Sequence, residues 1–340
     1  MRVLVTGATG FIASHTIADL LASGHDVRGT VRSIANAKAE GAFESMPGRE
    51  RLEFVEADLL GAGDFDAAVA DCDAVLHMAS PYVVDVADPQ RDLVDPAVTG
   101  TRSVLEAAAR APGVRRVVLT SSAAAISDEP PTDRLLTETD WNEKSSLARN
   151  PYYYSKTLAE RAAWRFVEEA RPGFDLVVVN PVVVVGPSLS KRVNESVRIL
   201  LDLATGRYPV IMDLGWSFVD VRDVARAHVL AMTTAAASGR YVCAAKTLMM
   251  RDLVPMLKGA LPRAKLPSLA LDGAFGSALM RLASYTQPPG AGSYLRSNLG
   301  RPQRLDNAKI RRELGMAFRD VERSVVDTVE DLVRWGHVVR

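Results

Sequence analysis

Short runs of β-branched residues alternate with longer helical patterns through the first half of the chain, and this alternation constrains the fold most. The runs with strand character lie at residues 2–7, 26–31, 52–58, 74–80, 115–122 and 175–186. Helical patterns separate them at residues 12–24, 64–72, 100–113 and 155–172. Strands that alternate with helices in this way form βαβ units and a parallel sheet. Because the strands are apolar on both faces, helices should cover the sheet on both sides. We therefore predict an α/β fold with a doubly wound parallel sheet.

The alternation ends near residue 186, and this change predicts a second, smaller lobe. The segments near 187–218 and 246–300 are richer in Pro, Gly, Ser and Leu and show no clear period. Between them, residues 216–232 and 239–245 have the pattern of one more helix and strand of the first domain. We predict a Rossmann-type domain at 1–186 and 217–245, and a discontinuous substrate-binding lobe at 187–216 and 246–340. A cleft between two lobes is a common position for a ligand site.

The composition excludes several classes of function. Acidic and basic side chains cancel at 41 each among 340 residues, so we expect no nucleic acid or anionic membrane as a partner. Cys72 and Cys243 are too few for a disulfide framework and suit a reducing, cytoplasmic environment. The five histidines show no metal-ligand spacing, and we expect no metal site. The N-terminus does not have the pattern of a signal peptide, and the most apolar stretch, 176–186, is too short to span a bilayer.

A glycine-rich turn joins the first expected strand to the first expected helix in the stretch VTGATGFIASH, residues 5–15. Gly7 permits a tight turn, and Gly10 lets the backbone approach a pyrophosphate. The N-terminus of the following helix offers free N–H groups and a partial positive charge to that anion. A P-loop is excluded because no Gly-Lys-Ser/Thr follows. The turn therefore predicts a dinucleotide site, with contacts from Thr6, Gly7, Gly10, Phe11 and Ile12.

The end of the second expected strand distinguishes NAD from NADP. An acidic residue there would bind the ribose 2′-hydroxyl, whereas a basic residue accommodates a 2′-phosphate. Asp26 lies at the start of that strand, far from its tip, and the residue at the tip is Arg32. Lys38 is a weaker second candidate. We therefore expect NADP(H) as the cofactor.

Three tyrosines precede a lysine in the stretch NPYYYSK, residues 150–156. Asn150 is a good N-cap and Pro151 suits the first helical position, so a helix should begin at the tyrosines. Tyr152 and Lys156 are then four residues apart and share one face of the helix. Tyr154 points elsewhere, while Tyr153 stays a less favoured alternative at three residues from the lysine.

These two motifs resemble those of the extended short-chain dehydrogenases/reductases, which carry T-G-x-x-G-x-x-G/A and Y-x-x-x-K. Here the first motif runs from Thr6 to Ala13, with the alanine in place of a glycine that serves helix–strand packing. The resemblance covers nearly the whole chain and is strongest to dihydroflavonol-reductase-like and aldehyde-reductase-like enzymes. It extends to NPVVVVGPSLS at 180–190 and FVDVRDVARAHVLAM at 218–232.

The resemblance implies a catalytic set and further cofactor contacts. In that family the tyrosine, here Tyr152, protonates the carbonyl oxygen as hydride arrives from the nicotinamide. The lysine, Lys156, holds the nicotinamide ribose and lowers the pKa of the phenol. A serine binds the same oxygen, and the pattern T-S-S-A favours Ser122, with Ser121 as the second candidate. The cofactor contacts carried over are Asp58 with Leu59 beside the adenine, Met78, Ala79 and Ser80 along the ribose, Pro181 and Val184 beside the nicotinamide, and Ser196. For Pro181 and Val184 the alternative is a merely buried strand end.

Two departures from the family limit what can be said of the substrate. Ser127 stands where plant dihydroflavonol reductases have an asparagine, and residues 150–156 keep only part of the cinnamoyl-CoA reductase motif N-W-Y-C-Y-G-K. Neither flavonoid nor acyl-CoA specificity follows from the sequence. We therefore expect an NADPH-dependent carbonyl or aldehyde reductase that acts on a small aldehyde or ketone, as a monomer or a homodimer.

Alternatives remain at this point. A sugar epimerase or a hydroxysteroid-type dehydrogenase would use the same tyrosine and lysine, but would more often have an acidic residue in place of Arg32. A cofactor-sensing regulator would usually lack the catalytic pair. His228, inside the helical pattern after Asp220, is expected to be structural, with Asp220 as a helix cap.

Overall fold

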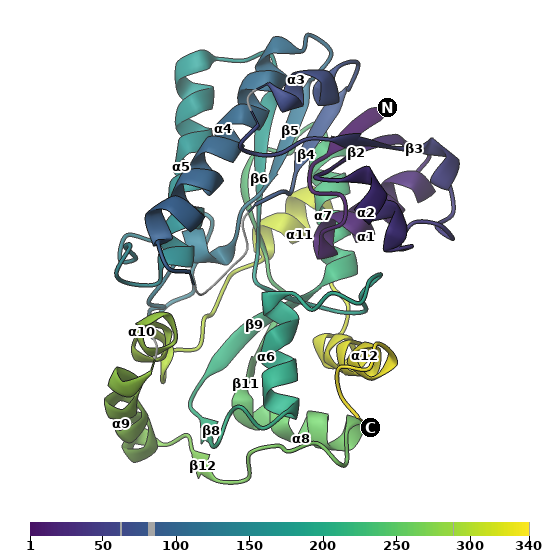
Figure 1. Ribbon diagram of the computed structural model, residues 1–340. Coiled ribbons are helices and arrows are strands. Elements are labelled where there is room, and N and C mark those ends of the chain that lie inside the picture. Colours follow the sequence, from purple (N-terminus) through teal and green to yellow (C-terminus); the bar gives the residue numbers. More distant parts are fainter. Residues whose placement is uncertain (62, 81–85, 288, 340) are drawn as a thin grey trace.

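The computed structural model describes residues 1–61, 63–80, 86–287 and 289–339 (Figure 1). Its largest sheet is built from β1 (Arg2–Val5), β2 (Asp26–Val31), β3 (Leu52–Glu56), β4 (Ala74–His77), β5 (Arg116–Thr120), β6 (Asp175–Pro181) and β10 (Gly239–Cys243). Among the described residues these seven strands are all parallel, in the order β10-β6-β5-β4-β1-β2-β3. The predicted doubly wound parallel sheet is confirmed.

Helices cover both faces of this sheet, because its strands are apolar on both sides. Along β1, Val3 and Val5 point into one hydrophobic core and Leu4 points into the other, as successive strand residues must. The first core packs against α1 (Phe11–Ala22), α7 (Val221–Thr233) and α11 (Ala308–Leu314). The second packs against α3 (Asp64–Val69), α4 (Asp95–Arg110) and α5 (Pro151–Ala170). Figure 1 shows the two layers on either side of the strands.

The strand order reverses between β1 and β4, which fixes where a ligand can bind. β1 pairs with β2 on one side and with β4 on the other. The chain therefore leaves these two neighbouring strands in opposite directions, and open α/β sheets with such a reversal bind ligands in a crevice at the carboxyl ends of the two strands. The glycine turn follows β1, and residues 78–80 follow β4, so both predicted segments meet at this crevice.

The stretch 175–186, predicted as one strand, is two strands in two sheets. β6 ends at Pro181, and β7 (Val183–Val185) pairs with β9 (Gly215–Asp220) outside the large sheet. Pro181 has no N–H to donate, and its ring fixes the backbone where the chain leaves the sheet. The continuous apolar run of the sequence hides this break, because both strands are buried.

The smaller lobe combines a three-stranded sheet with short helices. Its sheet has the order β11-β9-β7, with β11 (Lys246–Met249) antiparallel to β9, and β8 (Ile211–Met212) pairs with β12 (Ala270–Leu271). Its helices are α6 (Glu195–Ala204), α8 (Met250–Ala260), α9 (Ala274–Ala283), α10 (Pro289–Asn298) and α12 (Val321–Arg334). Leu200, Phe218, Leu253 and Val325 are buried in one core between these elements. Short elements elsewhere are α2 (Ile34–Ala39), a π-helical turn at Gln90–Val94, and 3₁₀ turns at Arg49–Arg51, Ala123–Ala125 and Ser284–Thr286.

The C-terminal part of the chain contributes to both halves. In α11, Ile310 and Leu314 are buried in the core beside the large sheet. In α12, Val325 and Val329 are buried in the core of the lobe. None of the helices in the described part of the chain combines the length and the apolarity that are needed to cross a lipid bilayer.

Candidate active site

The glycine turn forms a cradle that has room for backbone only. Gly7 has a φ of 69°, and a Cβ on it would lie 3.1 Å from the Cα of Ala79. A Cβ on Gly10 would lie 3.1 Å from the carbonyl oxygen of Gly7, which already accepts a 2.8 Å bond from the Gly10 N–H. Gly10 occupies the N-cap of α1 without any side chain to cap it, so N–H groups of the first helical turn remain for a ligand. These features fit the pyrophosphate of a dinucleotide.

Thr6 ties the end of β1 to the end of β4. Its buried hydroxyl accepts hydrogen bonds from the N–H groups of Met78, at 3.0 Å, and Ala79, at 2.9 Å. It also shares a 2.8 Å hydrogen bond with Nδ1 of His77. Burial lowers the pKa of His77 to about 3, so this ring is neutral. The backbone of residues 78–80, predicted to pass the cofactor ribose, is therefore held beside the glycine turn.

Two cations follow β2 in the chain. Arg32 follows β2 directly and is exposed, and Lys38 lies in the last turn of α2, also exposed. Neither side chain has a hydrogen bond or an ion pair with any residue in the described ranges. Asp58 and Leu59 follow the neighbouring strand β3, where the Asp58 carboxylate accepts a 2.9 Å bond from the N–H of Leu60. Arg32 and Lys38 can therefore bind an anionic group without losing a partner within the described residues.

The predicted helix begins where the tyrosines begin, but Asn150 does not cap it through its side chain. α5 starts at Pro151, and Asn150 has a φ of 48° without a side-chain cap hydrogen bond. Its amide donates instead to the buried carboxylate of Asp128 and, at 3.3 Å, to the hydroxyl of Ser297 on α10. Asn150 thus connects the start of α5 to the lobe.

Tyr152 and Lys156 lie on one face of α5, as their spacing predicts. The Lys156 ammonium is 5.9 Å from the centroid of the Tyr152 ring. Lys156 is 8% exposed, and burial lowers its pKa to about 8. No carboxylate in the described residues forms an ion pair with it. A buried cation in this setting is stabilised when an acceptor binds beside it.

The two candidate serines have different partners. The hydroxyl of Ser121 donates a 2.5 Å hydrogen bond to the buried carboxylate of Glu160. The hydroxyl oxygen of Ser122 accepts a 3.1 Å bond from the Ala124 N–H and caps a short 3₁₀ turn. Its hydrogen has no acceptor within the ranges that the structure describes. This arrangement favours Ser122, the half-buried one, as the serine that can donate to a substrate.

Three more of the predicted cofactor contacts, of which Pro181 and Val184 are expected beside the nicotinamide, lie on three different elements. Pro181 ends β6, Val184 is the middle residue of β7, and Ser196 lies in the first turn of α6. All three are buried. Their contacts with a cofactor stay predictions.

His228 has the structural role that the sequence predicts. It is buried on α7, where its ring bonds to the Thr120 hydroxyl at 2.8 Å and to the Val224 carbonyl at 2.7 Å. Burial lowers its pKa to about 4, so the ring is neutral. The side chain of Asp220 caps α7 through a 2.8 Å bond from the Arg222 N–H.

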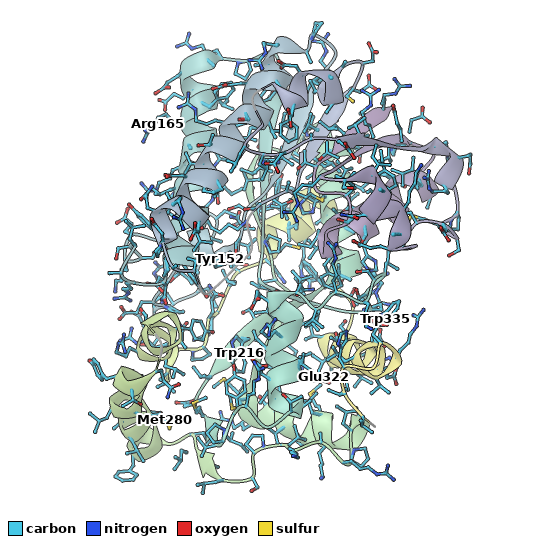
Figure 2. All side chains as sticks on the ribbon, in the orientation of Figure 1. Tyr152, Arg165, Trp216, Met280, Glu322 and Trp335 are labelled. Carbon is cyan, nitrogen blue, oxygen red and sulfur yellow. The ribbon has the colours of Figure 1, made fainter. Side chains whose placement is uncertain are left out.

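Aromatic residues of the lobe face the tyrosine segment, and sequence reasoning missed them. Burial raises the pKa of Tyr294, on α10, well above its usual range, and the nearby phenols of Tyr153 and Tyr208 act in the same direction. Tyr208 packs edge-to-face with Trp216 of β9, with ring centroids 6.5 Å apart. Figure 2 shows Tyr152 at the end of the large domain that faces the lobe, and Trp216 within the lobe. No local motif marks these aromatic residues, because they come from separate segments.

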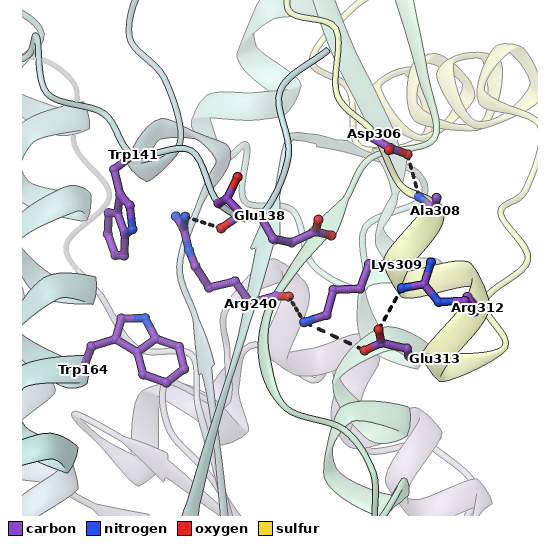
Figure 3. Close-up of a pocket in the computed structure, with 10 residues that line it drawn as sticks. Glu138, Trp141, Trp164, Arg240, Asp306, Ala308, Lys309, Arg312 and Glu313 are labelled. Atoms are coloured by element: carbon purple, nitrogen blue, oxygen red, sulfur yellow. Dashed lines mark hydrogen bonds and ion pairs between the residues drawn. The ribbon is translucent and has the colours of Figure 1, made fainter.

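A pocket of about 580 Å³ lies elsewhere, at the edge of the large sheet (Figure 3). Its lining contains none of the predicted site residues. Its cations are paired internally: Arg240 bonds to the carbonyl of Asp140 at 2.6 Å, and Arg312 bonds to Glu313 at 2.9 Å. The chemistry of the site therefore points to the crevice at β1 and β4, not to this pocket. Among the described residues, no group of three or more His, Cys, Asp or Glu could hold a metal ion.

The comparisons with known proteins agree with this geometry. Residues 3–244 match the model of the NAD dependent epimerase/dehydratase family. Cinnamoyl-CoA reductase 1 of Petunia hybrida is 38% identical, over 99% of this chain and 93% of that protein. Tetraketide alpha-pyrone reductase 1 of Arabidopsis thaliana is 35% identical, over 99% of this chain and 97% of that protein.

A solved structure is similar over the whole chain. The yeast methylglyoxal/isovaleraldehyde reductase Gre2, complexed with NADPH, has a TM-score of 0.80 and 31% identity, with 99% of this chain and 100% of that chain covered. The predicted resemblance is confirmed. The chain belongs to the NAD dependent epimerase/dehydratase family, and within it to the extended short-chain reductases that resemble dihydroflavonol reductase.

Proposed function

We propose that this protein reduces the carbonyl group of an aldehyde or ketone to an alcohol, with NADPH as the cofactor and Tyr152 as the proton donor. The protein is an NADP-dependent oxidoreductase that acts on carbonyl groups. The identity of the carbonyl compound and the roles of individual residues are the proposed part. The observation that carries it is the buried Lys156, which has Tyr152 as its neighbour and no ion-pair partner in the described residues.

The residues of the large domain would hold the cofactor along the crevice. Gly7 and Gly10 admit the pyrophosphate to the backbone of the turn, and Arg32 with Lys38 receives the 2′-phosphate. Lys156 donates to the hydroxyl groups of the nicotinamide ribose, which gives its buried charge an acceptor. When bound, NADPH supplies the hydride that becomes the new C–H bond.

Two hydroxyl groups would act on the carbonyl oxygen. Ser122 donates a hydrogen bond to that oxygen and holds it, while the hydroxyl of Tyr152 transfers its proton to it as negative charge develops. Proton transfer by a positioned side chain contributes a factor of about 10²–10⁴ in rate. The ammonium of Lys156 stabilises the phenolate that remains on Tyr152, because opposite charges attract strongly where water is excluded.

The lobe would form the opposite wall of the substrate site. Tyr153 and Tyr294 are both half-buried and present aromatic surface near the start of α5, and such surface suits a substrate with a flat or apolar body. The relatives include proteins named cinnamoyl-CoA reductase and tetraketide alpha-pyrone reductase, and the named compounds carry flat, unsaturated groups. We propose a small aldehyde or ketone with an apolar substituent as the substrate class.

The test is the oxidation of NADPH with a panel of aldehydes, diketones and acyl-CoA esters. We expect turnover with at least one aldehyde or ketone and a weaker rate with NADH. If no compound is reduced while NADPH still binds, the proposal is wrong and a cofactor-sensing role replaces it. Tightly bound NAD in the purified protein, with conversion of a sugar nucleotide and no net change in NAD, would indicate an epimerase instead.

A further inference from the structure

The carboxylate of Glu160 is buried on α5, the helix that carries Tyr152, and is not among the groups proposed to meet substrate or cofactor. It connects this helix to the serine strand, by which we mean β5 with Ser121 and Ser122 at its end. Glu160 is 1% exposed and lies one helical turn after Lys156. It accepts hydrogen bonds from Ser121 at 2.5 Å, from Asn180 at 2.8 Å and from Arg240 at 2.6 Å. The indole of Trp164 adds a longer one at 3.3 Å.

Two of these donors flank Ser122. Ser121 precedes it at the end of β5, and Asn180 lies in β6, the neighbouring strand. The amide of Asn180 donates to the carbonyl oxygen of Ser122 at 3.3 Å, in addition to its bond to Glu160. The Glu160 carboxylate therefore holds the backbone at Ser122 through two separate contacts.

The same side chain belongs to the helix that carries the other two catalytic candidates. Tyr152, Lys156 and Glu160 follow at intervals of four residues, so they form one row along α5. A shift of α5 against β5 would have to break the bonds to Ser121 and Asn180. The distance between the hydroxyl of Ser122 and that of Tyr152 thus depends on Glu160.

Arg240 forms a buried ion pair with this carboxylate. Its guanidinium is 7% exposed and is oriented by the carbonyl groups of Glu138, at 2.9 Å, and Asp140, at 2.6 Å. It also stacks on the ring of Trp141, at 3.9 Å from the centroid. A buried ion pair contributes little net stability compared with apolar residues of the same volume. Its use here is better explained by the orientation that it imposes on the serine strand.

We propose that Glu160 is a positioning residue for the carbonyl reduction, which sets Ser122 against Tyr152 by binding Ser121 and Asn180 from α5. This inference rests on the proposed function, in which both hydroxyl groups act on one carbonyl oxygen. Glu160 itself touches neither substrate nor cofactor. It should therefore affect kcat far more than the binding of either.

Three variants test the role of Glu160. Glu160→Gln keeps the length of the side chain and removes its charge. Ser121→Ala removes the hydrogen bond from Ser121 to Glu160 and leaves the ion pair between Glu160 and Arg240. Asp223→Asn is the matched control: Asp223 is a buried carboxylate that is paired with Arg319, on α7 and without a bond to the serine strand. The measurements are kcat, KM, the affinity for NADPH, the melting temperature, and hydrogen exchange of peptides that cover residues 118–126.

We expect kcat to fall by about 10- to 100-fold in Glu160→Gln and by about 3- to 10-fold in Ser121→Ala, because small errors in alignment cost this much. KM and the affinity for NADPH should stay within about threefold, since Glu160 touches neither ligand. Exchange at residues 118–126 should rise in both variants and stay unchanged in Asp223→Asn.

A folded Glu160→Gln with the kcat and the exchange of the wild type overturns the proposal, and so does a loss of kcat equal to that of Asp223→Asn at equal melting temperature. If Glu160→Gln does not fold, Ser121→Ala decides by the same criteria. A wild-type protein without NADPH-dependent reduction would refute the proposed function instead, and hydrogen exchange would still judge whether Glu160 orders the serine strand.

Discussion

The large domain and the lobe use their polar groups differently. In the large domain, polar side chains at the ends of parallel strands are buried and bonded to one another, as Thr6 is to residues 77–79 and Ser121 is to Glu160. In the lobe, aromatic side chains lie near the tyrosine segment: Tyr294 of α10 is half-buried close to Tyr153, and Trp216 of β9 is buried. The first region can fix the position of reacting atoms, and the second can only shape the space around them. Variants in the two regions should therefore fail in different ways.

The largest effect is expected from Gly10→Val in the large domain. A Cβ at this position would lie 3.1 Å from the Gly7 carbonyl oxygen, and the two methyl groups would fill the space for the pyrophosphate. We expect NADPH binding to be lost while the circular dichroism spectrum stays normal. A folded variant that titrates with NADPH at wild-type affinity would show that the cradle is elsewhere.

The next effect should separate the three tyrosines. Tyr152→Phe removes the proposed proton donor and keeps the ring, so folding and NADPH binding should survive while kcat/KM falls by about 10²–10⁴. Tyr153→Phe and Tyr154→Phe should each stay within about tenfold, because their rings serve packing and the cleft wall. The measurement is kcat/KM on one common aldehyde. An inactive Tyr153→Phe would instead identify Tyr153 as the proton donor. The contrast between reacting groups in the large domain and shaping groups near the lobe would then not hold.

A matched pair of core leucines tests whether the lobe is dispensable for the cofactor. Leu20 on α1 and Leu253 on α8 are both fully buried, one in each half. Either leucine replaced by alanine should lose about 2–5 kcal/mol of stability. We expect Leu20→Ala to weaken NADPH binding as well, because α1 supports the glycine turn, and Leu253→Ala to leave it unchanged. Thermal unfolding and a cofactor titration check both, and equal losses of NADPH affinity would refute the separation.

The choice of cofactor should depend on a single exposed side chain. A charge-assisted hydrogen bond is worth about 1.5–3 kcal/mol, so Arg32→Ala should weaken NADPH binding by roughly ten- to a hundredfold and leave NADH nearly unchanged. Lys38→Ala, which removes an exposed cation from the same edge, should have a smaller effect. If NADH binding falls as much as NADPH binding, Arg32 supports the fold and not the 2′-phosphate.

The smallest effect concerns stability and has a defined dependence on pH. Burial lowers the pKa of Lys156 to about 8, whereas a free lysine titrates near pH ~10.4. Between these values the unfolded chain binds more protons than the folded one, so stability rises with pH across this window and the penalty is complete below it. Lys156→Met should therefore raise the stability of the cofactor-free protein by about 1–3 kcal/mol near pH 7, with no gain above the window.

The same variant should bind NADPH less well, since the ammonium is the proposed donor to the ribose. Thermal unfolding at neutral and at high pH, with and without NADPH, measures both effects. A Lys156→Met protein that melts earlier than the wild type at neutral pH would mean that the charge is stabilised by the fold itself.

The local patterns of the sequence determined much of the large domain. The alternation of β-branched runs with helical patterns predicted the parallel sheet, because βαβ units connect in few ways. The turn at Gly7 and Gly10 and the four-residue step from Tyr152 to Lys156 depend on neighbouring residues only. Their spacing therefore predicted which groups share a turn or a helix face.

The tertiary structure decided what depends on distant segments. It split the apolar run 175–186 after Pro181, where β7 pairs with β9 outside the large sheet. In the folded chain, the side chain of Asn150 donates to Asp128 and to Ser297 of α10 and does not cap a helix. Tyr294, also on α10, lies near the tyrosine segment. The tertiary structure also distinguished Ser121 from Ser122, since Ser121 bonds to Glu160 whereas Ser122 caps the 3₁₀ turn that follows. Glu160 stands four residues after Lys156 in the sequence, but its partners Ser121, Asn180 and Arg240 lie 20 to 80 residues away, and no local pattern contains them.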